Sequence, residues 1–407
     1  MKILVVNAGP VYPVKAMSQM RTHHMIQVLS KDFTIDLLTT VNNNESELVS
    51  LEKMQAVGGD FIALQSVKHN GNKLKKRFVQ LIDYFNYYFF GIDKEVTANY
   101  WYQKKIAKII NQSDYSVVIG NYWETSFYFN KLKKGIFKIL DPHYAVGENW
   151  DVFSKVKQSG IKTFFEKRRL RKNLKFEQGI ISSSDMLLPL SQRNFDEFHK
   201  IAPSKPSLLV ADGSDIQHYV DFPIHPDPKT ILFYGAMGSA QNRGAFWRFY
   251  NEIYPAVKAQ NPSLKILVVG ANPPNDIKEL ENTGDVIVTG FVKDVREYLG
   301  QAWFKILPLE LGSGFRGRII EIMAMGIPVI GTHNALDSVG LTHEKNGFVT
   351  DSNETMISCC LKLLNDHEYR NLISKNGVEF VQTNYSLEAT FGKLNRKLLE
   401  MKAQGKL

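Results

Sequence analysis

The sequence of 407 residues predicts an α/β protein made of two Rossmann-like α/β/α domains that face each other across a cleft. Three observations lead to this prediction. The length suits two domains or more, at roughly 150 residues per domain. Short β-branched runs alternate with amphipathic segments, which is typical of parallel sheets covered by helices on both faces. The alternation also starts afresh after a proline-rich segment near residue 220.

Each half of the chain supplies six short runs of apolar and β-branched residues that predict strands. In the first half these are Lys2–Val6, Ile35–Thr40, Phe61–Leu64, Ser116–Ile119, Phe137–Leu140 and Met186–Leu190. In the second half they are Thr230–Tyr234, Leu264–Val269, Val286–Thr289, Phe304–Leu307, Pro328–Gly331 and Gly347–Val349. Helical patterns between them include Met17–Leu29, Asn242–Lys258, Arg316–Met325 and Glu354–Leu364.

The clearest break between the halves is the segment 221–228, which holds three prolines in six residues. Proline lacks a backbone N–H group, and it biases the preceding residue away from the helical conformation. A new strand with a glycine-containing loop follows at once. We therefore place the hinge between the two domains at about residue 220.

Composition limits the class of protein. Hydrophobic residues make up 44% and charged residues 22%, as in ordinary globular domains, and no run of 18 apolar residues predicts a transmembrane helix. The first residues, Met1–Asn7, read as a strand rather than as a secretion signal. The two cysteines, Cys359 and Cys360, are adjacent, so they cannot form a structural disulfide or a zinc site. We expect a cytoplasmic protein without a bound metal.

The net charge of +9 favours anionic partners, although it also serves solubility alone. Two segments concentrate the positive charge. The aromatic-rich stretch 73–91 begins with four basic residues and could lie on an anionic membrane surface, or pack as a helix on the sheet. The second basic run, 162–175, reads more simply as a solvated helix face.

The sharpest motif is a strand, a Gly-Ser-Gly turn and a helix start, which together span Lys305–Glu321. Glycines allow close approach to a ligand and present N–H groups at the positive end of a helix. Arg316 and Arg318 add cations at that end, where the helix dipole favours anions. This conflict predicts an anion site. Glu321 lies about 8 Å along the helix from Arg316, at ~1.5 Å per residue, which is about the span from a diphosphate to the ribose hydroxyls of a nucleotide. Its carboxylate could instead form an ion pair with Arg318.

This motif, continued by the segment 321–330, resembles the sequence pattern of family 4 glycosyltransferases with the GT-B fold. It is similar to the sugar-transferase branch in which Pro-Leu-x-x-Gly-Ser-Gly precedes the helix. Further similarities are found at 234–238, 268–270, 288–295 and 384–388. The resemblance covers residues 230–400 and reaches the first half only in topology. It implies an acceptor domain over 1–220, a donor domain over 221–385 and a terminal helix over 386–407 that crosses back.

The resemblance also implies a role for single residues. Those expected to bind the nucleotide-sugar donor are Gly235, Gly238, Ser239, Phe291, Val292, Gly312, Ser313, Gly314, Phe315 and Glu321. Arg243 and Arg318 would stabilise the diphosphate leaving group without a metal ion. Ser313 stands where many members carry a second glutamate, which bears on the transferred sugar and on activity.

The first domain is expected to hold the acceptor. Gly9 follows the first predicted strand and precedes two adjacent histidines, of which His23 is a candidate acceptor ligand. Asp141 and His143 end another strand, where family members place polar groups that touch the donor sugar; Asp141 could instead form a turn before proline. Trp123 could line the acceptor cavity or pack in the core.

The expected activity is retaining transfer of a sugar from a UDP- or GDP-linked donor to a glycan or lipid-linked acceptor, in the synthesis of cell-surface polysaccharide or glycoconjugate. No cofactor is implied, and the enzyme would be cytoplasmic or peripheral at the inner membrane surface. The alternative is a catalytically silent GT-B partner subunit or binding protein, suggested by Ser313. A sugar-nucleotide epimerase fits less well, because it needs acid/base carboxylates around the sugar and Ser313 is not one. A dehydrogenase and a nucleic-acid binder also fit less well, since the sequence has no Gly-x-Gly-x-x-Gly after either first strand and no nucleic-acid-binding module.

Overall fold

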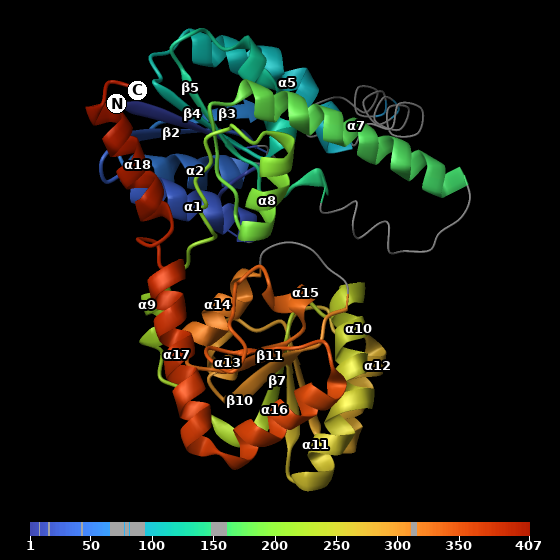
Figure 1. The fold of residues 1–407 in the computed structure, drawn as a ribbon. Helices are drawn as coiled ribbons and strands as arrows, with labels where there is room; N and C mark the ends of the chain where they lie inside the picture. Colours follow the sequence, from blue (N-terminus) through green and yellow to red (C-terminus); the bar gives the residue numbers. More distant parts are fainter. Residues whose placement is uncertain are drawn as a thin grey trace. The chain divides into compact units, whose positions relative to one another are not determined.

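The computed structural model shows two compact units, which are described separately below (Figure 1). The N-terminal unit comprises Met1–Gly213 and Thr390–Leu407, and the C-terminal unit comprises Ser214–Ala389. The structure describes residues 1–7, 9–14, 17–41, 44–65, 77, 81, 94–147, 161–310 and 316–407.

The N-terminal unit is built on a six-stranded parallel sheet with the order β3-β2-β1-β4-β5-β6. Its strands are β1 (Lys2–Asn7), β2 (Thr34–Val41), β3 (Phe61–Gln65), β4 (Val117–Asn121), β5 (Phe137–Asp141) and β6 (Met186–Leu187). Its helices are α1 (Met17–Leu29), α2 (Asn44–Ala56), α5 (Lys94–Asn111), the 3₁₀ segment η2 (Trp123–Lys131), α7 (Ile161–Ser183), α8 (Gln192–Ile201) and α18 (Phe391–Ala403). Strands buried on both faces read as continuous apolar runs, and Ile3–Val6 are at most 1% exposed.

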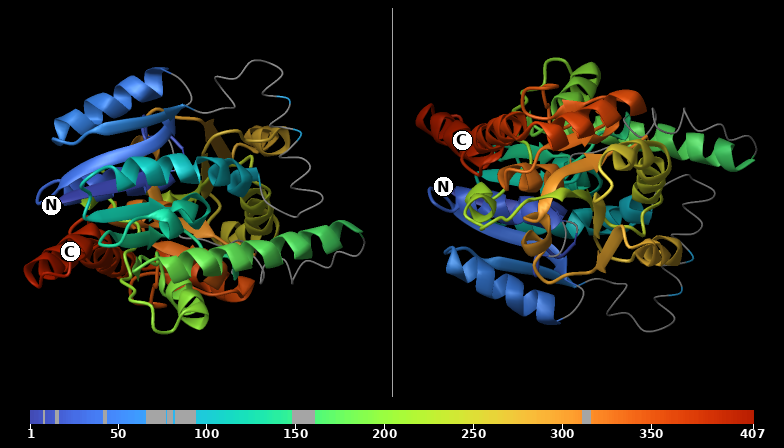
Figure 2. Two further views of the ribbon diagram at one scale, coloured as in Figure 1. Left: turned by 90° about the horizontal axis from the view of Figure 1, so that it is seen from above. Right: turned by 90° about the horizontal axis from the view of Figure 1, so that it is seen from below.

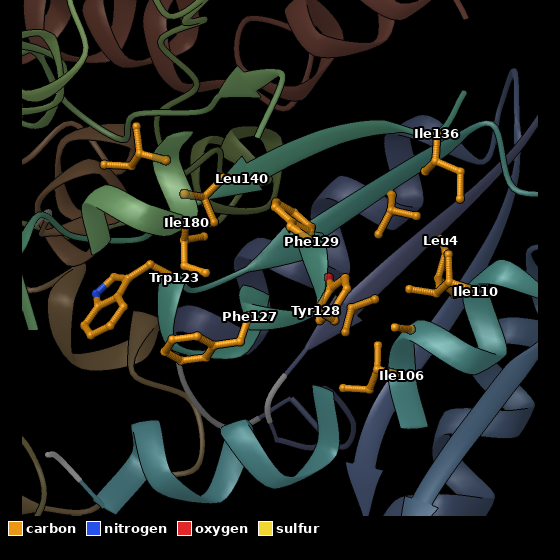
Figure 3. Packing of buried hydrophobic residues seen from close by; sticks show 14 of the residues in the cluster. Leu4, Ile106, Ile110, Trp123, Phe127, Tyr128, Phe129, Ile136, Leu140 and Ile180 are labelled. Atoms are coloured by element: carbon orange, nitrogen blue, oxygen red, sulfur yellow. The ribbon is translucent and has the colours of Figure 1, made fainter. Parts of the chain in front are cut away.

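One face of this sheet packs against α5 and η2 in a hydrophobic cluster (Figure 3). Leu4 and Leu140 from the sheet meet Ile110 from α5 and Phe129 from η2, all of them buried. Trp123 belongs to the same cluster and is 1% exposed. Of the two alternatives for Trp123, the structure shows core packing.

The C-terminal unit has a second six-stranded parallel sheet, with the order β12-β11-β10-β7-β8-β9. Its strands are β7 (Asp227–Tyr234), β8 (Lys265–Val269), β9 (Val286–Gly290), β10 (Ala302–Leu307), β11 (Val329–Gly331) and β12 (Phe348–Val349). Its α-helices are α9 (Ile216–Val220), α10 (Ala240–Arg248), α11 (Tyr254–Gln260), α12 (Asn275–Lys278), α13 (Arg296–Leu299), α14 (Gly317–Ala324), α15 (His333–Leu336), α16 (Asn353–Asn365) and α17 (His367–Tyr385). A π-helical turn, η3 (Phe249–Ile253), and a 3₁₀ turn, η4 (Glu279–Thr283), complete it.

The two sheets confirm the predicted α/β class, and the differences from the expected elements have local causes. The helix expected over 242–258 is split by the π-helical turn η3 just before Pro255, whose missing N–H group cannot continue the α-helical hydrogen bonds. The strand expected over 186–190 ends at Leu187, two residues before Pro189. The strand expected from Thr230 begins earlier, at Asp227.

The cysteines and the helices agree with two further expectations from composition. Cys359 and Cys360 are both buried free thiols. Within the part of the chain that the structure describes, no helix is both long enough and apolar enough to span a bilayer.

Candidate functional site

Polar side chains gather at the carboxyl edge of the N-terminal sheet, where ligands bind in open parallel sheets. Asn7, Asn121 and Asp141 end three neighbouring strands, β1, β4 and β5, and all three are buried. The Asn121 side-chain amide donates to Asn7 Oδ1 at 3.2 Å and to Thr22 Oγ1 at 2.8 Å. The parallel topology therefore brings together residues that lie more than 100 positions apart in sequence.

Arg21, on α1, is the centre of this group and is 1% exposed. Its guanidinium donates to both carboxylate oxygens of Asp141, with N–O distances of 2.8 to 3.1 Å. The Nη1 atom also donates to the carbonyl of Val210 at 2.9 Å and to Asp212 at 3.0 Å. The cation lies 5.4 Å from the ring centre of Phe391 on α18. One side chain thus joins four separate segments of this unit.

Burial and neighbouring charges together set the pKa values in this group. Burial alone would lower the pKa of Arg21, but the carboxylates of Asp141 and Asp212 raise it. Burial raises the pKa of Asp212, against the opposing effect of Arg21. Burial also lowers the pKa of His143, so this imidazole is neutral at neutral pH.

His143 lies beside Asp141, just after the end of β5. Its Nε2 atom lies 3.6 Å from Asp141 Oδ2 and, among the described residues, has no hydrogen-bond partner. The ring stacks on Tyr122 at 3.9 Å, and both residues have positive φ angles, 61° and 65°. Such backbone strain in non-glycine residues is found mainly at functional sites.

The other candidate acceptor residues lie at the same edge of the sheet. The carbonyl of Gly9 accepts hydrogen bonds from the side chains of Asn7 and Thr39. His23 Nδ1 lies 3.0 Å from the hydroxyl of Tyr12, and burial followed by the charge of His24 lowers the pKa of His23. Of the three acceptor candidates, only Trp123 is enclosed in the hydrophobic core.

In the C-terminal unit, two cations lie at Tyr234, at the end of β7, and a third, Arg316, acts on one of them through its charge. Lys305, on β10, donates from Nζ to the Tyr234 carbonyl at 2.9 Å and is 1% exposed. Its ammonium lies 5.6 Å from the Tyr234 ring centre, and the Arg318 guanidinium of α14 lies 5.1 Å from it. Two N–H-bearing atoms of Arg316, Nε and Nη2, are buried and find no acceptor among the described residues.

Burial, reinforced by the charges of Arg318 and Arg316, lowers the pKa of Lys305 to about 7. Burial also lowers the pKa of Arg316. No ion pair within 4.0 Å joins Lys305, Arg316 or Arg318 to a carboxylate in the part of the chain that the structure describes. We call these three residues the cation cluster. The glycine-rich motif predicts the two arginines but not Lys305, although a lysine inside an otherwise apolar strand is itself an unusual pattern.

Glu321 lies one helical turn beyond Arg318 on α14 and is half-buried. Its carboxylate accepts a hydrogen bond from Tyr219 of α9 rather than forming an ion pair with Arg318. Burial raises the pKa of Glu321, against the effects of Tyr219 and Arg318. The sequence does not predict a role for Tyr219, because the short helix α9 next to the domain boundary carries no motif.

The remaining donor candidates surround the end of β7. The backbones of Gly235 and Gly270 approach so closely that a Cβ atom on Gly270 would lie 1.8 Å from the Gly235 carbonyl. Gly238 follows in the same loop, and Ser239 is the N-cap of α10 without a side-chain capping bond. The segment 312–315, with Gly312, Ser313, Gly314 and Phe315, lies outside the described residues.

Three donor candidates lie at or near the surface. Arg243 is exposed and forms an ion pair with Asp276 of α12, so its guanidinium is not free for a phosphate unless that pair opens. Phe291 is 83% exposed, and Val292 beside it is half-buried. An exposed aromatic ring after β9 is a surface that can stack against a planar ligand.

A family model matches part of the C-terminal half of the chain. Residues 228–366 match the family model described as glycosyl transferases group 1. No curated protein matches the sequence of the chain.

Solved structures resemble the whole chain. Sucrose-phosphate synthase from Thermosynechococcus elongatus is 17% identical, with a TM-score of 0.66 and coverage of 99% of this chain and 100% of that one. HepE from Anabaena, in complex with UDP, is 12% identical, with a TM-score of 0.65 and the same coverage. A glycosyltransferase from Rickettsia africae is 16% identical, with a TM-score of 0.63 and 98% of each chain covered. These likenesses show that the chain has the GT-B fold.

The Arg21 network predicts a large stability loss when the cation is removed. Arg21→Met leaves the carboxylates of Asp141 and Asp212 buried without their partner, and we expect a loss of about 3–5 kcal/mol in the free energy of unfolding. Urea denaturation measures it, with the exposed Lys31→Met as the control. A loss below about 1 kcal/mol would show that the network contributes little to stability.

Lys305 predicts a distinctive dependence of stability on pH. Its pKa is about 7 in the folded chain and 10.5 ordinarily, so between these values the unfolded chain carries a proton that the folded chain lacks. The free energy of unfolding should therefore rise with pH from about 7 to 10.5. In Lys305→Met this rise should be smaller. Urea denaturation at several pH values measures it. Profiles that run parallel in wild type, Lys305→Met and the exposed control Lys375→Met would contradict the prediction.

Proposed function

We propose that the chain is a retaining, metal-independent glycosyltransferase, because residues 228–366 match the family model described as glycosyl transferases group 1. It takes a hexose from a UDP- or GDP-linked donor and transfers it to a glycan or lipid-linked acceptor. The product enters cell-surface polysaccharide or glycoconjugate synthesis. The protein works in the cytoplasm, free or at the inner membrane surface.

The observation that carries the proposal is the cation cluster. Three cations lie together, two of them largely buried, with no carboxylate paired to them in the described residues. A buried charge without a partner costs free energy, so the arrangement favours an anion bound beside it. The diphosphate of a sugar nucleotide supplies two or more negative charges at a helix start, where backbone N–H groups also point outward.

Glu321 supports a nucleotide rather than a simple phosphate. Its carboxylate lies on the same helix as Arg318 and is held by Tyr219. A carboxylate accepts hydrogen bonds from a pair of ribose hydroxyls, as in other nucleotide sites. The exposed ring of Phe291 offers a stacking surface for the base.

HepE, one of the proteins with the same fold, was solved with UDP and with UDP-glucose. That complex makes UDP the first nucleotide to test here. The proposal for this chain rests on the cation cluster and Glu321, which are its own residues.

In this mechanism the cation cluster stabilises the leaving group. The bond between the sugar C1 and the β-phosphate oxygen breaks, and its electron pair stays on that oxygen. A hydroxyl of the acceptor forms the new bond to C1 and passes its proton to the departing phosphate oxygen. Arg316 and Arg318 face the developing negative charge. Lys305 is close to half-protonated at pH 7, and a bound diphosphate raises its pKa, so the lysine takes up a proton as the donor binds.

In the N-terminal unit, His143 is the residue that contacts the sugar. Its neutral Nε2 has no partner among the described residues and can exchange a hydrogen bond with a hydroxyl. Asp141 is fully buried and held on both oxygens by Arg21, so it positions His143 rather than reacting itself. Gly9 and His23 lie at the same sheet edge and bind the acceptor.

The alternative is a catalytically silent GT-B subunit, since Ser313 replaces the glutamate expected to touch the transferred sugar. A silent subunit binds nucleotide without consuming it. Slow hydrolysis of one sugar nucleotide by the purified chain, abolished in His143→Ala, would support the enzyme. Nucleotide binding with no hydrolysis and no transfer to any acceptor would support the silent subunit.

The donor site predicts stabilisation by one nucleoside diphosphate. Thermal unfolding is measured with UDP, GDP, ADP and CMP and their sugar conjugates, without added metal. A ligand at a hundredfold excess over its Kd stabilises the native state by about 2.7 kcal/mol, which gives a clear shift in Tm.

Glu321→Gln should remove most of that shift while leaving the Tm of the free protein almost unchanged. A lost hydrogen bond to a charged group costs about 1.5–3 kcal/mol, which corresponds to roughly ten- to a hundredfold in Kd. The matched control is Glu379→Gln, an exposed glutamate on α17. Equal Tm shifts in both variants, or no shift with any nucleotide in wild type, would refute the donor site.

A further inference from the structure

Helix α7 carries a stripe of exposed basic side chains that neither the sheet nor the proposed reaction uses. Five exposed side chains recur at helical spacing on it: Phe164, Lys167, Arg168, Arg171 and Lys175. At 100° per residue they fall on one stripe of the helix, and we call them the basic face of α7. The opposite side packs into the unit through Asn173, Glu177 and Ile180, all of them buried.

The described residues of the same unit do not neutralise the basic face. No ion pair joins Lys167, Arg168, Arg171 or Lys175 to another described residue. Glu177, an acidic residue of the same helix, turns into the core and accepts a hydrogen bond from the Val146 backbone at 2.9 Å. The four positive charges are therefore available to an external anionic partner.

Two phenylalanines lie at the outer end of the same helix. Phe164 is 63% and Phe165 37% exposed, and their rings meet edge to face at 5.8 Å. Figure 1 and both views of Figure 2 show this end of α7 extending well beyond the strands of its own unit. Large exposed aromatic side chains cost solvation free energy, so two of them beside four cations indicate a contact surface.

We propose that the basic face of α7, with Phe165, binds an anionic lipid bilayer. Lysine and arginine side chains reach the phosphate headgroups while the two rings enter the boundary between headgroups and acyl chains. A second copy of this chain is a poor occupant, because two such faces repel each other. The proposal does not involve the basic, aromatic-rich stretch 73–91 that the sequence places at a membrane surface as one alternative. Most of that stretch lies outside the described residues.

The test is binding of the purified full chain to vesicles, measured by co-sedimentation. Vesicles of phosphatidylcholine alone are compared with vesicles that also contain phosphatidylglycerol. We expect binding only to the anionic vesicles, weakened by salt. Each basic residue near such a surface contributes about 1 kcal/mol, or roughly fivefold. Replacing Lys167, Arg168, Arg171 and Lys175 by glutamine should thus lower the partition coefficient by roughly a hundredfold or more.

The control removes four exposed lysines from the C-terminal segment of the same unit: Lys393, Lys397, Lys402 and Lys406. Replacing these four lysines by glutamine lowers the net charge by the same four units as the α7 variant, and this control should bind vesicles like wild type. A second variant, Phe164→Ser with Phe165→Ser, keeps the charge and should bind more weakly and with greater salt sensitivity. Far-UV circular dichroism checks the fold of each variant.

Three outcomes would overturn the proposal. The first is equal loss of binding in the α7 variant and the control, which would make the effect one of net charge alone. The second is equal binding to neutral and anionic vesicles. The third is retention by single-stranded DNA, lost in the α7 variant, together with no vesicle binding, which would make the face a nucleic-acid site. None of these measurements involves a nucleotide sugar, so they stand apart from the test of the donor site.

Discussion

The buried guanidinium of Arg21 is the interaction on which the N-terminal unit depends. A charge taken out of water must be matched at close range, and Arg21 is matched by the carboxylates of Asp141 and Asp212 and by the Val210 carbonyl. Those groups come from β5 and from the segment 210–212, which lies just before the chain enters the C-terminal unit at Ser214. The carboxyl edge of the sheet is thereby fixed, and the strained backbone at His143 is held beside it.

In the C-terminal unit, by contrast, buried positive charges are not paired with carboxylates of the described residues. Lys305 and Arg316 lie in the interior or at its margin without a carboxylate among the described residues to balance them. Sequences tend to violate local rules of this kind at functional sites, where a ligand completes the arrangement. The buried guanidinium of Arg21 is thus paired with carboxylates inside its unit, whereas Lys305 and Arg316 have no such partner among the described residues.

Most of the fold could be predicted from the sequence, because parallel strands buried on both faces leave unmistakable apolar runs such as Lys2–Asn7. Ends of elements were harder, since they depend on single residues: Pro255 gives the π-helical turn η3, a detail that periodicity does not encode. Asp141, at the end of β5, could be found from the rule that ligands bind at the carboxyl ends of strands, and Glu321, on α14, from the glycine-rich motif before that helix.

The partners of those residues could not be found in the same way. Arg21 lies 120 positions from Asp141, and Tyr219 lies about 100 from Glu321; only the folded sheet and its neighbouring helices make them neighbours. The environment of Arg243 was also beyond the sequence, because its ion pair with Asp276 depends on where a four-residue helix lies.

The position of α18 sets an order of events during synthesis. Phe391, Leu394 and Leu398 are fully buried in the N-terminal unit, yet the ribosome makes them only after the whole of Ser214–Ala389 has been translated. The unit that begins first therefore finishes last. While the intervening residues are being made, the ring of Phe391 is missing from the side of Arg21 that it later covers. During that interval a part of the hydrophobic surface under α18 stays exposed, which is the condition under which nascent chains need protection from aggregation.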